Sequence, residues 1–264
     1  MYYFIFEPPL NKKIEKIEEE IKARASEAQI GGEFVTLSLA ERPESLAKIG
    51  LQKDYQTIVA VGSDVLINSV AQGLIKNEAV LGAIPLEEGS VFLPLIGVSS
   101  WQEALEILPA RKVKLIDSVL LNRSFRFITQ VEIVPPPNKK GTIVLAFDGY
   151  FRVEISERKI IVSNVGVKLD KRAEISSSST DGFLDVFIPG RSEIKKPWWQ
   201  FFSKVKREEM EKGSIFHPKY LEVNSKLKLK AMVYKRVVET SPFLFEIEPK
   251  TLNFIVKRGQ RENE

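Results

Sequence analysis

The stretch that most constrains the fold is residues 56–74, which reads QTIVAVGSDVLINSVAQGL. The apolar run from Thr57 to Val61 precedes the turn Gly62-Ser63-Asp64, and apolar residues at helical spacing follow it, so the pattern predicts a strand, a turn and a helix. Such a turn directs free backbone N–H groups and the positive end of the helix dipole at one point, where an anion such as phosphate can bind. The alternative is a helix N-cap, in which Ser63 or Asp64 accepts from these N–H groups.

Composition excludes several classes of protein and of site. The 264 residues, 44% hydrophobic and 28% charged, indicate a soluble globular chain, and no apolar run reaches the about 18 residues of a membrane-spanning helix. The absence of cysteine excludes disulfides, thiolate metal sites and cysteine nucleophiles. The single histidine, His217, excludes a multi-histidine metal site, and we assign it no role. The N-terminus lacks the basic region and cleavage site of a signal peptide, so we expect a cytoplasmic location.

Charge is distributed unevenly along the chain. The net charge is only +4, but residues 191–258 hold 16 Lys and Arg against 8 Asp and Glu. This excess favours either an anionic partner, such as a lipid or a membrane surface, or a solvated basic face without a partner. We expect no nucleic-acid partner, and the sequence leaves the oligomeric state open.

The first 110 residues alternate short apolar runs with amphipathic segments. This order predicts an α/β domain, with a doubly wound parallel sheet, over residues 1–110. The expected strands are Tyr2 to Phe6, Phe34 to Leu39, Thr57 to Val61 and Val80 to Ile84, and the expected helices are Leu10 to Ile21, Pro43 to Ile49, Leu66 to Ile75 and Trp101 to Leu108.

After Pro109, strand candidates follow one another without helices between them. This shift predicts a second, mainly antiparallel β-sandwich or barrel domain over residues 111–252. A strand near residues 253–257 is expected to return to the first domain, and residues 259–264 to fray. One helix is expected from about Pro197 to Glu211. The expected strands are Lys112 to Leu120, Phe125 to Val134, Thr142 to Phe147, Tyr150 to Ile155, Ile160 to Val165, Phe183 to Ile188, Tyr220 to Val223, Leu227 to Tyr234, Phe243 to Ile247 and Phe254 to Val256.

Several short motifs, in order and spacing, resemble the catalytic domain of the diacylglycerol kinase and sphingosine kinase family, a lipid kinase family whose superfamily includes NAD kinases. Residues 62–66, GSDVL, resemble the family's GGDGT nucleotide motif, and residues 85–93, PLEEGSVFL, resemble its PLGTGNDFA motif. Residues 181–186, DGFLDV, resemble its D-G-x-L-D-V segment, and residues 247–252, IEPKTL, resemble its final V-x-P-x-x-L motif. The resemblance covers nearly the whole chain.

The resemblance implies that a nucleotide binds to the first domain, and that a lipid or other substrate binds to the second, residues 111–252. Carried over by motif, the nucleotide-binding residues would be Gly62, Ser63, Asp64, Asn68, Gly89 and Ser90. ATP and Mg²⁺ would be the cofactors of an active member, and an inactive member would need none.

The chain also departs from the family's motifs. Val65 and Leu66 place bulk where the family leaves space for phosphate. Glu87 and Glu88 stand where a polyphosphate would approach, and like charges repel. Residues 7–9, Glu-Pro-Pro, replace the family's N-terminal N-P-x-S-G signature. These departures predict an eroded nucleotide motif.

The family's catalytic base is lost in this sequence. By register, its D-G-E segment falls at Tyr234-Lys235-Arg236. A Tyr with an ordinary pKa of about 10 is a weak base at neutral pH. We therefore assign no catalytic residue and expect no efficient turnover.

Two acidic residues are candidate metal ligands. The resemblance implies Mg²⁺ near Asp181 and Asp185, and the alternative is a polar turn after a run of serines.

The most apolar part of the basic region is a candidate for lipid contact. Trp198, Trp199, Phe201 and Phe202 are flanked by Lys and Arg, as in a helix that lies at a membrane interface. The alternative is a helix that packs some of these rings onto the second domain.

Three functions are compatible with these patterns. The leading hypothesis is a degenerate diacylglycerol kinase-like protein, weakly active or inactive, that retains lipid or nucleotide binding. The second is an active ATP-dependent lipid kinase that phosphorylates a lipid hydroxyl with non-standard catalytic residues. The third is a membrane-surface interaction module, peripheral at the membrane.

Overall fold

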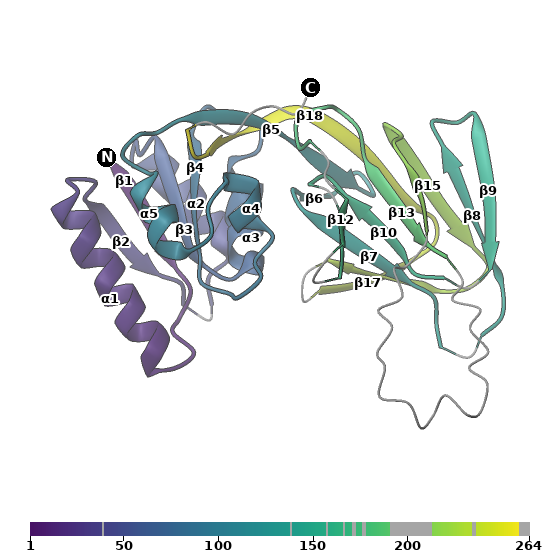
Figure 1. Ribbon diagram of the computed structural model, residues 1–264, viewed down its shortest axis with the longest axis horizontal. Coiled ribbons are helices and arrows are strands. Elements are labelled where there is room, and N and C mark those ends of the chain that lie inside the picture. Colours follow the sequence, from purple (N-terminus) through teal and green to yellow (C-terminus); the bar gives the residue numbers. More distant parts are fainter. Residues whose placement is uncertain are drawn as a thin grey trace. The chain divides into compact units, whose positions relative to one another are not determined.

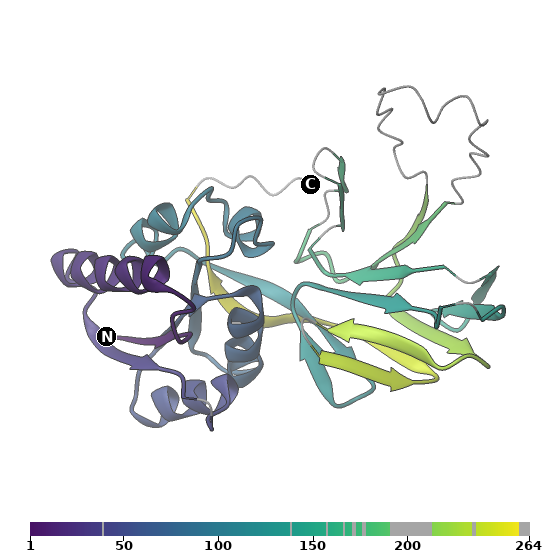
Figure 2. The ribbon, with the colours of Figure 1, turned by 90° about the horizontal axis from the view of Figure 1, so that it is seen from below.

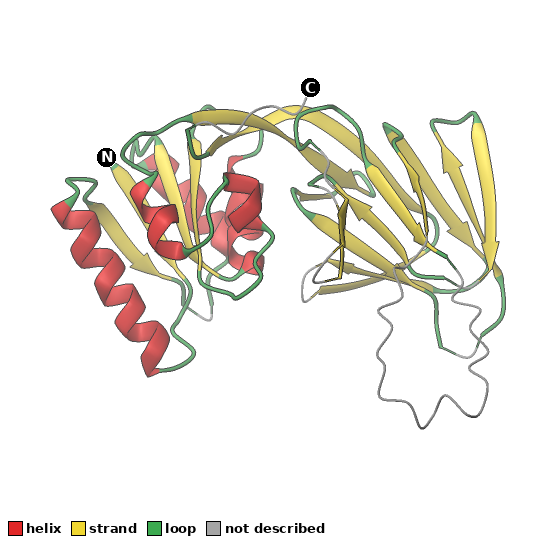
Figure 3. Cartoon of the chain, in the orientation of Figure 1, coloured by secondary structure: helices red, strands yellow, loops and turns green. Residues whose placement is uncertain are grey.

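The structure is a computed structural model that describes residues 1–38, 40–137, 139–156, 158–165, 167–170, 173–175, 178–190, 213–233 and 236–258. The chain divides into two compact units, drawn in Figure 1. The first unit consists of Met1–Thr129, Ser178–Phe183 and Leu244–Glu264, and the second of Gln130–Ser177 and Leu184–Phe243. In the described part of the chain, all helices belong to the first unit (Figure 3).

A parallel sheet forms the centre of the first unit, with its strands in the order β2-β1-β3-β4. β3 and β4 are buried along their whole length, which explains their continuous apolar sequences. Figure 2 shows α1, α4 and α5 on one face of this sheet and α2 and α3 on the other. The bounds are β1 Tyr2–Phe6, α1 Lys12–Glu27, β2 Gly32–Thr36, α2 Pro43–Gln52, β3 Thr57–Gly62, α3 Asp64–Leu74, β4 Val80–Pro85, α4 Phe92–Ile96 and α5 Trp101–Glu106. The predicted doubly wound α/β architecture is confirmed.

Three further strands complete the first unit: β5 (Val113–Leu121), β6 (Phe125–Phe127) and β18 (Phe243–Ile255). β18 runs parallel to β4 and antiparallel to β5. It is one strand with a bulge between Glu248 and Leu252, where the sequence predicted two separate strands. The expected strand from Phe125 to Val134 is instead divided into β6 and β7, which belong to different units.

The second unit is built of antiparallel strands, as the sequence predicted. One sheet has the order β14-β13-β10-β7-β16-β17, and β15, β8 and β9 pair side by side. The ring of Phe147 in β8 stacks on Phe216 in β14, with 4.7 Å between centroids, and so joins the two groups of strands as in a sandwich. The bounds are β7 Gln130–Val134, β8 Thr142–Phe147, β9 Phe151–Ser156, β10 Ile160–Ser163, β11 Val167–Asp170, β12 Ala173–Ile175, β13 Asp185–Pro189, β14 Gly213–Phe216, β15 Tyr220–Ser225, β16 Leu229–Val233 and β17 Arg236–Thr240.

The sequence did not predict α4, β14, β17 or the β11–β12 hairpin. α4 is only five residues long and contains a proline, so it has no helical periodicity to detect. No helix in the described part of the chain is both long enough and apolar enough to cross a membrane.

Candidate active site

The order of the parallel strands places a candidate site at the carboxyl ends of β1 and β3. β1 lies between β2 and β3, and β3 lies between β1 and β4, so the chain leaves the adjacent strands β1 and β3 toward opposite edges of the sheet. Ligands of doubly wound sheets bind at such a switch point, outside the carboxyl ends of the strands. Glu7 follows β1 here, and the turn Gly62-Ser63-Asp64 follows β3. The backbone N–H of Glu7 donates to the carbonyl of Val61 at 3.0 Å, which holds the two ends together.

The turn after β3 is tight and opens α3. Gly62 has a φ of +151°, and a Cβ at this position would lie 2.7 Å from the Cβ of Glu7. Only glycine therefore fits both the backbone conformation and the space. The Oγ of Ser63 accepts from the N–H of Leu66 at 3.3 Å, so Ser63 is the N-cap of α3. The N-cap alternative is thus observed.

Two carboxylates of the chain itself accept from the N–H groups of this turn. The N–H of Ser63 donates to Oε2 of Glu7 at 2.7 Å, and the N–H of Asp64 donates to Oε2 of Glu87 at 3.2 Å. Glu7 is half-buried and Glu87 is exposed. Both carboxylates sit at the positive end of the α3 dipole, where an anion is most stable. They occupy the donors that a bound phosphate would use.

Asp64 joins the turn to the loop that follows β4. One of its carboxylate oxygens accepts from the Oγ of Ser90, and the other accepts from the N–H of Val91 at 3.1 Å. The Oγ of Ser90 also accepts from the N–H of Phe92 at 3.1 Å, and the neighbouring Gly89 has a φ of +76°. The structure therefore brings the predicted residues Ser63, Asp64 and Ser90 together, but Asp64 and Ser90 bind each other, and Ser63 caps α3.

Asn68, which was also predicted to bind the nucleotide, instead binds the backbone of the segment after β6. Its side chain is 1% exposed, and its Oδ1 accepts from the N–H of Ile128 at 3.0 Å. Its Nδ2 has no hydrogen-bond partner among the described residues. Asn68 thus braces α3 against the segment after β6.

The bulk of Leu66 does not close the site, contrary to expectation. Its side chain is 2% exposed and belongs to the core of the first unit, because the first turn of α3 directs it toward the sheet. The turn is closed instead by the carboxylates of Glu7 and Glu87. The sequence indicated Glu87 through its charge, but the role of Glu7 was hidden because its partner, Ser63, lies 56 residues away.

The residues of this turn do not fit a magnesium-bound triphosphate as they stand. Two N–H donors are already engaged, and the carboxylates that engage them would repel phosphate oxygens at the same point. Among the described residues, no group of three or more His, Asp and Glu side chains could hold a metal ion.

The two predicted metal ligands have separate local partners. Asp181 belongs to the first unit, and its Oδ1 accepts from the N–H of Phe183 at 3.0 Å. Asp185 belongs to the second unit, is 1% exposed, and has its Oδ1 2.9 Å from Nδ1 of His217. His217, to which the sequence assigned no role, is therefore the ion-pair partner of a buried carboxylate when protonated.

A fully buried carboxylate that the sequence analysis missed is Asp117 in β5. Its Oδ1 accepts from the N–H of Lys250 at 2.7 Å, and its Oδ2 accepts from the N–H of Gly182 at 2.8 Å. Its own N–H donates to the carbonyl of Ser179 at 2.8 Å. Burial raises the pKa of Asp117 against the lowering effect of these hydrogen bonds. An Asp between the apolar residues of a mostly apolar strand was the signal that could have identified it.

Two predicted groups lie outside the described residues. They are the expected helix with Trp198, Trp199, Phe201 and Phe202, and the position of the family's catalytic base, Tyr234.

Comparison with solved structures identifies the fold. A crystal structure of a diacylglycerol kinase from Bacillus anthracis superposes with a TM-score of 0.75 and 15% identity, over 97% of each chain. The structure of an NAD kinase from Archaeoglobus fulgidus in complex with ATP superposes with a TM-score of 0.59 and 15% identity, over 98% of this chain and 94% of the other. No protein-family model and no curated protein matches the sequence. The chain therefore has the fold of diacylglycerol kinase-like proteins and NAD kinases, as the sequence motifs predicted.

Proposed function

We propose that this chain is a diacylglycerol kinase-like protein that is weakly active or inactive as a kinase and retains binding of a lipid or a nucleotide. The observation that carries the proposal is the pair of hydrogen bonds from the N–H groups of Ser63 and Asp64 to the carboxylates of Glu7 and Glu87. The ATP-bound NAD kinase of the same fold makes ATP the nucleotide to test.

Electrostatics supports this proposal. Phosphoryl transfer depends on positioning the phosphates and on neutralising their charge. At this turn the chain supplies two negative charges in place of free N–H donors. A phosphate group would have to displace both carboxylates and then remain beside them.

The test of catalysis is transfer of phosphate from ATP, with Mg²⁺ present, to diacylglycerol in mixed micelles. We expect no phosphorylated lipid above the rate without protein. Phosphorylation that is lost in Asp64→Ala would overturn the proposal and establish the second function, an active lipid kinase with non-standard catalytic residues.

Whether the carboxylates of Glu7 and Glu87 hinder nucleotide binding is tested by measuring ATP affinity by calorimetry. The double variant Glu7→Gln with Glu87→Gln removes both charges while keeping side-chain size. We expect it to bind ATP about tenfold more tightly than the unmodified protein, since close like charges are removed. Glu78→Gln, an exposed glutamate that precedes β4 and so lies at the opposite end of the parallel strands, is the matched control and should leave the affinity unchanged. Equal affinity in the double variant would show that the carboxylates do not close the turn.

A further inference from the structure

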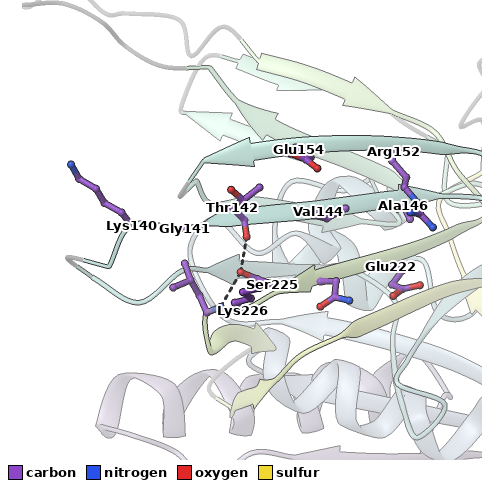
Figure 4. A pocket seen from close by; sticks show the side chains of 12 residues that line it. Lys140, Gly141, Thr142, Val144, Ala146, Arg152, Glu154, Glu222, Ser225 and Lys226 are labelled. Carbon is purple, nitrogen blue, oxygen red and sulfur yellow. Dashed lines mark hydrogen bonds between the residues drawn. The ribbon is translucent and has the colours of Figure 1, made fainter.

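A groove of about 640 Å³ lies on the outer face of β15, β8 and β9, within the second unit. Figure 4 shows Lys140, Gly141 and Lys226 at one end of the groove, and Ala146, Arg152 and Glu222 toward the other. The volume is within the range of small-molecule sites in proteins.

Short side chains on the central strand form the floor of the groove. Ile143 and Leu145 of β8 point into the core and are fully buried, so Val144 and Ala146 point outward. By strand register, Ala146 lies between Glu222 of β15 and Arg152 of β9. Val144 likewise lies between Asn224 of β15 and Glu154 of β9. Long polar side chains thus stand on both sides of a low apolar floor.

Two loops that carry lysines meet at one end of this floor. A Cβ on Gly141 would lie 2.8 Å from the side chain of Leu227, so the absence of a side chain at Gly141 lets the loops touch. The Oγ of Ser225 donates to the carbonyl of Thr142 at 2.8 Å and fixes the same contact. Lys139 and Lys140 flank it on one loop, and Lys226 and Lys228 on the other.

The charged side chains that line the groove have no partners within the described chain. No ion pair or hydrogen bond to another described residue involves the side chains of Lys140, Arg152, Glu154, Glu222 or Lys226. Charges of both signs are therefore present: the lysines stand at one end, and Glu154, Glu222 and Arg152 flank the floor. Val144, beside Glu154, is two residues or roughly 7 Å along the strand from Thr142 at the lysine end.

We propose that this groove binds a zwitterionic phosphate ester, with its phosphate at the lysine end and its ammonium group between Glu154 and Glu222. Lysine is a strong point-charge ligand for phosphate, and a carboxylate is the natural partner of an ammonium group. The two carboxylates outweigh the single guanidinium of Arg152 beside the floor, so the floor still favours a cation. A molecule that carries both groups a few ångströms apart can pair with the lysines and with the carboxylates, whereas a simple anion or a simple amine can pair with only one of the two.

The experiment is calorimetric titration of the full chain with glycerophosphoethanolamine, with glycerol phosphate and ethanolamine titrated separately. We expect saturable binding of the zwitterion, at least about tenfold tighter than binding of either single-charge probe. Absence of binding would overturn the proposal. Equal affinity for glycerol phosphate would overturn the ammonium part and leave an anion site at the lysines.

Three variants test whether the groove is a binding site or only a solvated face of the sheet. Ala146→Leu fills the floor, Lys226→Ala removes one phosphate ligand, and Glu154→Gln removes one charge beside the ammonium group. Each should weaken binding of the zwitterion about tenfold, and Glu154→Gln should not weaken binding of glycerol phosphate. Lys48→Ala, an exposed lysine of the first unit, is the control. Unchanged affinity in all three variants would overturn the assignment to this groove.

Vesicles distinguish the two sources of such a ligand. If the source is a lipid head group, vesicles that contain phosphatidylethanolamine should sediment the protein, and soluble glycerophosphoethanolamine should compete. If the source is a free metabolite, the soluble compound should bind and the vesicles should not. Binding of neither would contradict the proposal.

Discussion

Two of the places in the first unit at which carboxylates accept backbone N–H groups differ in burial. Asp117 is 0% exposed and holds the N–H groups of Gly182 and Lys250. At the start of α3, Glu7 is half-buried and Glu87 exposed. The carboxylate of Asp117 is enclosed by the protein, whereas the carboxylate of Glu87 at the α3 turn is open to solvent. The first arrangement is therefore structural, and the second competes with a ligand.

The largest expected effect is at Asp117. Asp117→Ala would leave the N–H groups of Gly182 and Lys250 without their acceptor, at a cost of about 3 kcal/mol in the free energy of unfolding. Urea denaturation measures this loss. Glu88→Ala, an exposed residue at the other site, should change it by less than about 0.5 kcal/mol. A loss below about 1 kcal/mol at Asp117 would mean that its hydrogen bonds are replaced by water.

The next largest loss of stability is expected at Gly62, where the backbone of the turn lies close to Glu7. Gly62→Ala places a Cβ 2.7 Å from the Cβ of Glu7 at a φ of +151°, and we expect a loss of about 2 kcal/mol. Gly89→Ala is the matched control because Gly89 also has a positive φ but meets no atom within 4 Å. It should cost about 1 kcal/mol. Similar thermal unfolding of the two variants would contradict the close contact with Glu7.

A third, smaller effect is the pH dependence of stability. Burial raises the folded-state pKa of Asp117 above its unfolded value, so the folded state binds more protons between the two values. The contribution of Asp117 to stability therefore falls as pH rises through this window. Asp117→Asn removes that slope, so the variant should lose less stability, relative to the unmodified protein, at pH 7 than at pH 4.

Glu248 provides a control in which the dependence of stability on pH has the opposite sign to that at Asp117. The hydrogen bond from Arg126, with Nε at 2.6 Å, is the main cause that lowers the pKa of Glu248 in the folded state. Its stabilising contribution is therefore complete above the unfolded pKa and is lost as pH falls through the folded one. Glu248→Gln should accordingly lose more stability at pH 7 than at pH 4, and denaturation at both pH values measures the two slopes. Slopes of the same sign in the two variants would contradict the assigned environments.

The smallest expected effect is at the carboxylates of the α3 turn. Glu87→Gln should change the free energy of unfolding by less than about 0.5 kcal/mol, because Glu87 is exposed and water can replace it. Glu7→Gln should cost about 1 kcal/mol, since Glu7 is half-buried and its bond to Ser63 is charge-assisted. A loss at Glu87 as large as at Asp117 would remove the distinction between the two sites.

The sequence predicted the fold well because its signals are local. Strand β3, the turn at Gly62 and helix α3 follow one another in one stretch, and each has its own pattern. The contacts that decide what the turn can bind are not local. Ser63 meets Glu7 from 56 residues away, and Asp117 meets Lys250 from 133 residues away. Periodicity cannot reveal such pairs. For this reason Leu66 was expected to fill the space for phosphate, and the bond from Ser63 to Glu7 was missed.

The groove in the second unit was beyond sequence reasoning for the same reason. Alternation in β8 indicates that Val144 and Ala146 face outward, but only strand register places Glu154 and Glu222 beside them. Its lysines come from two loops that are distant in sequence and meet at Gly141 and Leu227.

Because Glu7 accepts from the N–H of Ser63, its carboxylate competes with any external anion for that donor, and it belongs to the same chain as the donor. A group tethered in this way has an effective concentration on the order of millimolar or higher, which dilution of the protein cannot lower. A free phosphate compound must exceed that level, or bind through additional contacts, before it displaces Glu7. We therefore expect the turn not to bind dilute simple anions, and to bind only a phosphate compound that also makes contacts with other parts of the protein.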